Sequence, residues 1–165
     1  MDKTSSFFLL LLTVSIIVYG CIQKPDFSEV PELEFVGFSK TTMNQGTVNN
    51  DSTTLIVNFT DGDGDIGFAS DVFETNLTVV DNRTGNLYSN FKIPAIPEQG
   101  ANNGVSGEMR ILLLNTCCTF PDGIPPCESP EEYPTNELTF DIYMVDRAGN
   151  MSNVITTSPI TLLCN

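Results

Sequence analysis

The sequence predicts an all-β protein, a two-layer β-sandwich of about seven strands. Short runs rich in β-branched and aromatic residues recur from residue 32 onward, and clusters of Gly, Pro, Asn and Asp separate them. Several of these runs alternate apolar and polar residues, which is the pattern of a strand with one buried face. No segment of this part sustains the period of an amphipathic helix. These observations favour packed sheets over a helical fold.

The first four predicted strands lie in the N-terminal half of this part. The run 32–40 is the first of them, and 53–60, with Leu55, Val57 and Phe59 on one face, is the second. The third and fourth are 75–81 and 87–93. The segment 82–86, Asn-Arg-Thr-Gly-Asn, is a turn by composition and joins these two.

Three further strands complete the prediction. The run 108–114 follows a long loop rich in Gly, Asn and Pro, and it alternates. The clearest alternation is in 137–146, and the turn 147–150 connects it to the last run, 151–163. Pro159 inside that run indicates an edge strand or a bulge.

Seven short strands at this spacing describe an immunoglobulin-like sandwich, formed by residues 31–165 as one domain. A domain of this size can bury a single core. Residues 21–30 are mostly polar, contain Pro25 and show no period, so we interpret them as a tether.

The chain begins with an export signal. A mainly apolar run, 7–18, follows Asp2 and Lys3 and ends in Tyr19-Gly20-Cys21. It is shorter than the roughly 20 residues that cross a bilayer core, and it has the length of the apolar part of a secretory signal. We therefore interpret residues 1–20 as a signal peptide.

The end of this run resembles the lipobox of bacterial lipoproteins, in which a cysteine follows a small residue. In that family the peptide is removed before the cysteine, and the cysteine carries acyl chains, which implies lipidation of Cys21. The segments 61–67 and 145–153 add to the likeness, and together these features resemble small immunoglobulin-like lipoproteins of Bacteroidota. The resemblance implies that the protein is anchored to the bacterial outer membrane by its lipid. It would lie on either the periplasmic or the cell-surface face.

The charge of the chain limits its partners. Seven basic residues stand against 21 acidic ones, so the formal net charge is −14, and residues 1–20 contribute nothing to it. Such a surface repels nucleic-acid phosphates and anionic lipid head groups. We expect no nucleic-acid partner, and we expect contact with the membrane only through the lipid on Cys21.

Two missing residue types argue against catalysis. The chain has no histidine, which is the commonest general base and the commonest zinc ligand. It also has no tryptophan, the aromatic residue most often used as a flat platform for sugars. We therefore expect a protein that is not an enzyme.

Four of the five cysteines follow Cys21, and an even number in an exported chain indicates two disulfides. In the immunoglobulin-like topology Cys164 ends beside Cys117 and Cys118. We expect it to pair with one of these two, and Cys127 with the other. Zinc is the alternative, but the spacing lacks the usual pair of cysteines two residues apart, and no histidine completes the site.

The segment 61–67, Asp-Gly-Asp-Gly-Asp-Ile-Gly, is the strongest candidate site. Asp61, Asp63 and Asp65 offer a carboxylate at every second residue, with flexible glycines between them. Hard divalent cations such as Ca²⁺ bind several such oxygens at about 2.3–2.6 Å. The loop resembles calcium loops of the D-x-D-x-D type, but not an EF-hand, because Ile66 stands where an EF-hand needs glycine.

Strand register adds two candidate ligands from elsewhere in the chain. The inward-facing positions of 53–60 continue to Asp61, and those of 137–146 continue to Asp146. The loops after these two strands share one pole of the predicted sandwich, opposite the disulfides. Asp146 and the amide oxygen of Asn150 are therefore further predicted ligands, since a cation removes the cost of burying such carboxylates.

Other acidic residues and one alternative complete this hypothesis. Asp71 and Glu74 follow after a turn and could add ligands. The alternative is a solvated turn in which Arg147 or main-chain amides satisfy Asp146. We favour calcium, with an affinity of about 10⁻⁴–10⁻³ M, as in extracellular modules.

Three functions compete at this point. The first is a lipid-anchored, non-catalytic module of the cell envelope, which calcium stabilises and which serves adhesion or protein interaction. The second is a glycan-binding accessory lipoprotein of a surface nutrient-uptake system, which an exposed row of Tyr and Phe near the calcium pole would favour. The third is a hydrolase that uses two carboxylates, such as Asp63 and Asp141.

Overall fold

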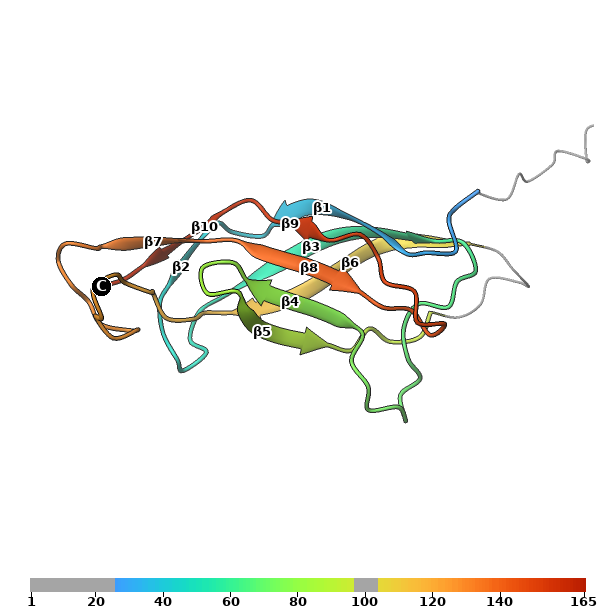
Figure 1. Ribbon diagram of the computed structural model, residues 1–165, viewed down its shortest axis with the longest axis horizontal. Helices are drawn as coiled ribbons and strands as arrows, with labels where there is room; N and C mark the ends of the chain where they lie inside the picture. Colours follow the sequence, from blue (N-terminus) through green and yellow to red (C-terminus); the bar gives the residue numbers. More distant parts are fainter. Residues whose placement is uncertain (1–25, 97–103) are drawn as a thin grey trace, which may run out of the picture.

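The computed structural model describes residues 26–96 and 104–165 (Figure 1). The predicted signal peptide, Cys21 and the first residues of the predicted tether lie outside these ranges. The described part is all-β, as predicted, and its strands form three sheets. None of its segments is a helix long and apolar enough to cross a membrane.

The first sheet forms one layer and is antiparallel, in the order β1-β3-β6. Its strands are β1 (Glu32–Phe38), β3 (Ser52–Asp61) and β6 (Val105–Leu114). The strand β3 lies in the centre and is buried at every second residue up to its last one. The predicted register of this strand is therefore confirmed, and it carries Asp61 inward.

The second layer consists of two short sheets that continue one another. The four-stranded sheet has the order β5-β4-β8-β9, and the three-stranded sheet has the order β2-β10-β7. Only Thr139 separates β7 from β8, and three residues separate β9 from β10. The strands of this layer are β2 (Thr42–Asn44), β4 (Leu77–Asp81), β5 (Asn86–Phe91), β7 (Thr135–Leu138), β8 (Phe140–Met144), β9 (Ile155–Thr156) and β10 (Ile160–Leu163).

The core lies between the two layers. The apolar faces predicted for the second, fifth and sixth strands are all buried, and Phe140 is the largest side chain that is fully enclosed. The last predicted strand is interrupted at Thr157, where a side-chain hydroxyl takes the place of a main-chain carbonyl in the hydrogen bonding with β8. The Thr157 hydroxyl accepts the N–H of Phe140 at 3.0 Å, and the Thr157 N–H donates to the Phe140 carbonyl at 2.9 Å. The interruption therefore leaves no gap in the hydrogen bonding at this point.

The two ends of the sandwich differ in chemistry (Figure 1). The loops that follow β3 and β8 lie at one end, and the chain terminus after β10 lies at the other. Both disulfides are at the second end, which we call the disulfide end. They join Cys117 to Cys127 and Cys118 to Cys164. This confirms the expected disulfides and decides between the two neighbours: the fully buried Cys118 pairs with Cys164.

Candidate metal centre

The candidate metal centre begins at Asp61, the last residue of β3. This side chain is completely buried. Its Oδ2 atom accepts the N–H of Asp65 at 3.0 Å, whereas its Oδ1 atom has no partner among the residues that the structure describes. A carboxylate oxygen that is buried without a donor is costly, which makes this atom an open position for a positively charged ligand.

Asp63 and Asp65 complete a group of three carboxylates. One ligand oxygen from each of Asp61, Asp63 and Asp65 lies within 4.8 Å of the others. Asp65 is half-buried, and its Oδ1 atom also lacks a partner within the described part of the chain. Asp63 is exposed, so the group is open to solvent on its side. Three carboxylates this close repel one another unless a cation lies between them.

Burial and repulsion shift the acidity of this group. Desolvation, together with the charge of Asp63, raises the pKa of Asp61 to about 6. The pKa of Asp65 is also raised, by desolvation first and then by the nearby charges of Asp146 and Asp63. The native fold therefore disfavours the ionised form of both groups. A bound cation would reverse both shifts, because it stabilises the ionised form.

The loop around the three carboxylates is held by Ile66 and Gly67. The side chain of Ile66 is completely buried and anchors the loop in the core. Gly67 has a φ of +83°, and a Cβ atom there would lie 2.3 Å from the carbonyl oxygen of Pro94. Only glycine fits this position. Ile66, which stands where an EF-hand has glycine, is thus the residue that anchors this loop in the core.

A second anchor comes from the N-terminal segment. The N–H of Gly62 donates to the carbonyl oxygen of Ser28 at 2.6 Å. A Cβ atom on Gly62 would lie 2.3 Å from the carbonyl oxygen of Phe27. The chain that enters the domain therefore lies directly against the acidic loop, between Asp61 and Asp63. Sequence reasoning missed this contact, since nothing in the residues 26–30 indicates where they pack.

The turn after β8 adjoins the acidic loop, as strand register predicts. Asp146 is buried, with 3 % of its surface exposed. Its two carboxylate oxygens accept the main-chain N–H and the side-chain Nδ2 of Asn150, both at 2.8 Å. Two hydrogen bonds join this turn to the acidic loop. The N–H of Ala148 donates to the Asp65 carboxylate at 2.9 Å, and Arg147 donates to the Gly67 carbonyl at 3.0 Å.

Asp146 and Asn150 thus satisfy each other, and within the described part of the chain Arg147 forms no hydrogen bond or ion pair with the Asp146 side chain. The three clustered carboxylates are Asp61, Asp63 and Asp65, and Asp146 acts on Asp65 through its charge. Asp71 and Glu74 are exposed and lie outside this group. Three carboxylates with two unoccupied oxygens suit a hard cation that keeps several water ligands.

The carboxylate considered for hydrolysis lies elsewhere. Asp141 is on β8, where its Oδ1 atom accepts a hydrogen bond from Thr156 at 2.6 Å and one from Asn82 at 2.9 Å. These two hydrogen bonds lower the pKa of Asp141. Asp63 is in the loop at the end of the sandwich, so the two carboxylates have separate surroundings.

Comparison of the chain with known protein families, with curated proteins and with solved structures gave no match. The role of the protein is therefore inferred from its residues and their geometry.

Proposed function

We propose that this chain is a lipid-anchored, non-catalytic module of the bacterial cell envelope, which binds Ca²⁺ at its acidic loop and serves adhesion or protein interaction. The observation that carries the metal part of this proposal is Asp61, a fully buried carboxylate with one unpartnered oxygen beside Asp63 and Asp65. Calcium at the millimolar concentrations found outside cells would occupy a site of about 10⁻⁴–10⁻³ M affinity.

The immunoglobulin-like part of the proposal is supported by the strand order. After β1 pairs with β3 in one layer, the chain crosses and β2 pairs with β10 in parallel in the other layer. The order β1-β3-β6 against β5-β4-β8-β9 corresponds to the A-B-E and C′-C-F-G arrangement of immunoglobulin-like sandwiches. A fold of this kind is compatible with many functions, so the role rests on the site and the anchor.

The lipid anchor is supported by the lipobox at Cys21 and by the short chain that follows it. Five residues separate Cys21 from Phe27, whose carbonyl lies against Gly62. A chain of this length spans at most about 20 Å when it is extended. In this proposal the acidic loop faces the membrane and the disulfide end faces away from it.

The arrangement of aromatic residues does not favour the glycan alternative near the metal centre. Tyr88 packs edge-on against Phe140, with ring centroids 4.9 Å apart, and its hydroxyl donates to the Leu114 carbonyl at 2.6 Å. Tyr133 contacts Phe120, beyond the disulfides. These rings do not form an exposed row beside the acidic loop, and Phe73, which is 98 % exposed in the segment after that loop, is a single ring.

The metal is tested by thermal unfolding of the full-length chain with increasing calcium. We expect the melting temperature to rise by a few degrees at millimolar calcium, since a ligand at ten times its Kd stabilises the native state by about 1.4 kcal/mol. Asp63→Asn should reduce this rise and Asp71→Asn, an exposed residue outside the group, should leave it intact. An unchanged melting temperature in the wild type would exclude calcium at this loop.

A further inference from the structure

A cavity with several polar lining residues lies at the disulfide end, away from the acidic loop. It has a volume of about 490 Å³ and lies between the edge strand β5 and the segment that follows β6. Cavities of about 300–1,000 Å³ hold small ligands in proteins. Leu87 and Leu112, each more than half exposed, form part of its apolar wall. Neither the metal centre nor the proposed anchor uses this cavity.

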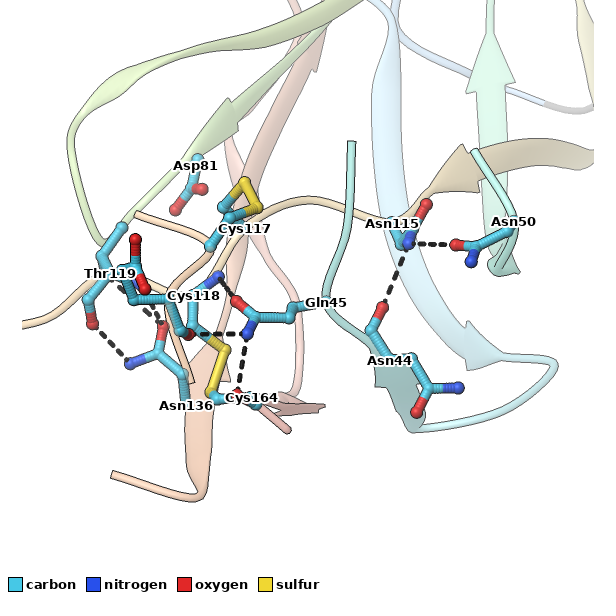
Figure 2. Close-up of a disulfide and its surroundings, with 12 residues drawn as sticks. Asn44, Gln45, Asn50, Asp81, Asn115, Cys117, Cys118, Thr119, Asn136 and Cys164 are labelled. Atoms are coloured by element: carbon cyan, nitrogen blue, oxygen red, sulfur yellow. Dashed lines mark hydrogen bonds between the residues drawn. A yellow bond between two sulfur atoms is a disulfide. The ribbon is translucent and has the colours of Figure 1, made fainter. Parts of the chain in front are cut away.

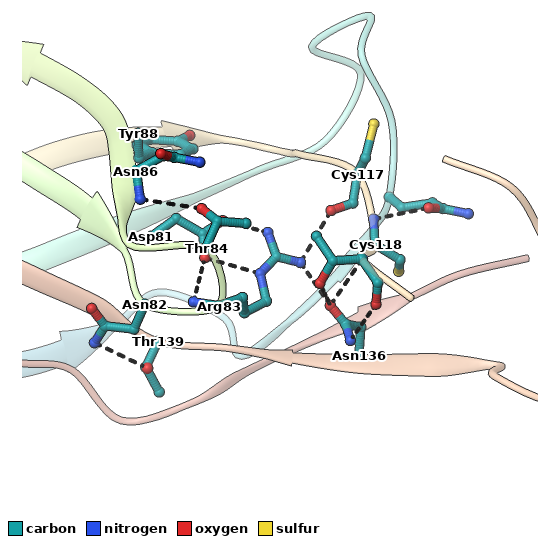
Figure 3. A network of polar contacts seen from close by, with 12 residues as sticks. Asp81, Asn82, Arg83, Thr84, Asn86, Tyr88, Cys117, Cys118, Asn136 and Thr139 are labelled. Atoms are coloured by element: carbon teal, nitrogen blue, oxygen red, sulfur yellow. Dashed lines mark hydrogen bonds and ion pairs between the residues drawn. The ribbon is translucent and has the colours of Figure 1, made fainter. Parts of the chain in front are cut away.

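Arg83 fixes one wall of the cavity in place (Figure 3). Its Nε and Nη2 atoms donate to the two carboxylate oxygens of Asp81, at 3.0 and 2.5 Å. Its Nη1 atom donates to the Cys117 carbonyl at 3.0 Å and to Asn136 Oδ1 at 2.7 Å. Asp81 is the last residue of β4, so the charge pair joins this wall to the sheet, and the Cys117–Cys127 disulfide cross-links the segment that follows β6.

A second network fixes the opposite rim (Figure 2). The Nδ2 atom of Asn115, which lines the cavity, donates to the Asn44 carbonyl at 3.2 Å and to Asn50 Oδ1 at 2.9 Å. Gln45 accepts the N–H of Cys118 at 3.0 Å and donates to the Cys164 carbonyl at 2.8 Å. The loop 45–50 is thereby tied to the core disulfide. Because its walls are already held in place, the cavity need not become ordered when a ligand binds, which favours affinity.

The charges of the cavity select against ionic ligands. Among the described residues that line it, Asp81 and Arg83 are the charged ones, and they neutralise each other. An anion would find no free cation, and the Asp81 carboxylate already accepts three hydrogen bonds, from the N–H, Nε and Nη2 of Arg83. The net charge of −14 disfavours anions further. The preferred ligand is therefore neutral.

The uncharged polar groups indicate what kind of neutral ligand fits. In the described part of the chain, the side chains of Asn86 and Thr116 line the cavity and make no hydrogen bond. An amide and a hydroxyl each donate and accept, so they match a ligand whose groups do the same. Tyr88, Leu87 and Leu112 offer a firm apolar surface beside them. Hydroxyl groups alternating with C–H faces are the chemistry of a carbohydrate.

We propose that this cavity is a binding site for a neutral carbohydrate, with Asn86 and Thr116 as its hydrogen-bonding groups and Tyr88 as its fixed wall. The site is at the end of the sandwich opposite the metal centre. Its binding therefore does not depend on calcium, and its failure would leave the metal proposal standing.

The test is binding of the full-length chain in detergent to an immobilised panel of neutral oligosaccharides of hexoses, pentoses and N-acetylhexosamines. Uronic-acid and sulfated oligosaccharides are displayed beside them, and the panel is run with a calcium chelator present. We expect retention of neutral members and a five- to ten-fold weaker Kd for Asn86→Ala, roughly the effect of one lost hydrogen bond.

The matched control is Asn90→Ala, since Asn90 is exposed on the same strand and does not line the cavity. It should bind as the wild type does. The proposal is wrong if no neutral member is retained, if acidic members are preferred, or if Asn90→Ala weakens binding as much as Asn86→Ala.

Discussion

The N–H of Asp65 donates to one carboxylate oxygen of Asp61 over 3.0 Å, and the other oxygen of Asp61 is buried with no partner in the described chain. A single hydrogen bond thus turns Asp61 into a half-satisfied anion at the end of a core strand. Nearby Asp63 adds repulsion. The stability of this end of the sandwich should respond to any change that removes or neutralises the Asp61 charge.

The first prediction concerns Asp61→Asn. The amide oxygen can still accept the N–H of Asp65, and the buried charge is gone. We expect the metal-free variant to be more stable than the metal-free wild type by about 1–3 kcal/mol, the cost of an unpaired buried polar group. Its response to calcium should disappear. Urea unfolding with a chelator and with calcium measures both, and a variant that is less stable in the chelator would contradict the assignment.

The second prediction concerns pH. The pKa of Asp61 is about 6 in the native state and 3.8 as the reference value for the unfolded chain. Between these two values the native state holds a proton that the unfolded state has released. The metal-free protein should therefore lose stability as the pH rises from about 4 to 6, by roughly 3 kcal/mol in total, and lose no more above that from this group.

Two comparisons isolate this effect. Asp61→Asn should flatten the profile in that window, and calcium at pH 7 should restore part of the lost stability. Asp51 acts in the opposite sense and at lower pH. Its hydrogen bonds, the one from Lys40 first, lower its pKa to about 2, so its contribution is lost only as the pH falls from about 4 toward 2. If the stability of the wild type changes between pH 4 and 6 with the same slope as that of Asp61→Asn, the raised pKa of Asp61 is refuted.

The third prediction concerns Gly62→Ala. The added methyl group would meet main-chain atoms of Phe27 and Ser28, which cannot move aside as a flexible side chain can. We expect a loss of about 1–3 kcal/mol in urea unfolding, the usual cost of overpacking. Gly37→Ala is the control, because a Cβ atom there has nothing within 4 Å, and it should be close to neutral.

The fourth prediction separates the two disulfides. Cys118–Cys164 closes a loop of 46 residues and Cys117–Cys127 one of 10. By chain entropy, replacing both cysteines with alanine should cost about 4 kcal/mol for the first pair and about 3 kcal/mol for the second. The second replacement should weaken carbohydrate binding more than the first, because Cys117 itself lines the cavity, whereas Cys118 and Cys164 support its rim only through Gln45. Equal binding by both double variants would show that the short loop does not support the cavity.

Much of the fold was predictable from the sequence because the alternation is strong where both layers bury a face. The strands β3 and β8 illustrate this, since every second residue of each is buried and the same register carries Asp61 and Asp146 inward. The strand β2 was missed because its three residues are too few to show a period. The break between β9 and β10 was missed because threonine is common in strands. Only the contact with Phe140 shows that the Thr157 side chain, and not its carbonyl, accepts the hydrogen bond there.

The candidate site was predictable in part for a similar reason. The spacing of Asp61, Asp63 and Asp65 is local, so the sequence shows it and the structure brings the three together. The mutual hydrogen bonding of Asp146 and Asn150 depends on the exact shape of a turn. The walls of the cavity at the disulfide end come from four distant parts of the chain, and no local pattern indicates that they meet.

The hydrogen bond from the Gly62 N–H to the Ser28 carbonyl has a mechanical consequence. Any tension that enters from the N-terminal side reaches the folded body first at this contact, one residue beyond Asp61. A pulling force would separate the N-terminal segment from the acidic loop before it acted on the strands. An ion held between these carboxylates would stiffen the loop against which the segment packs, so the force needed to detach the segment should depend on the ionic composition of the surrounding fluid.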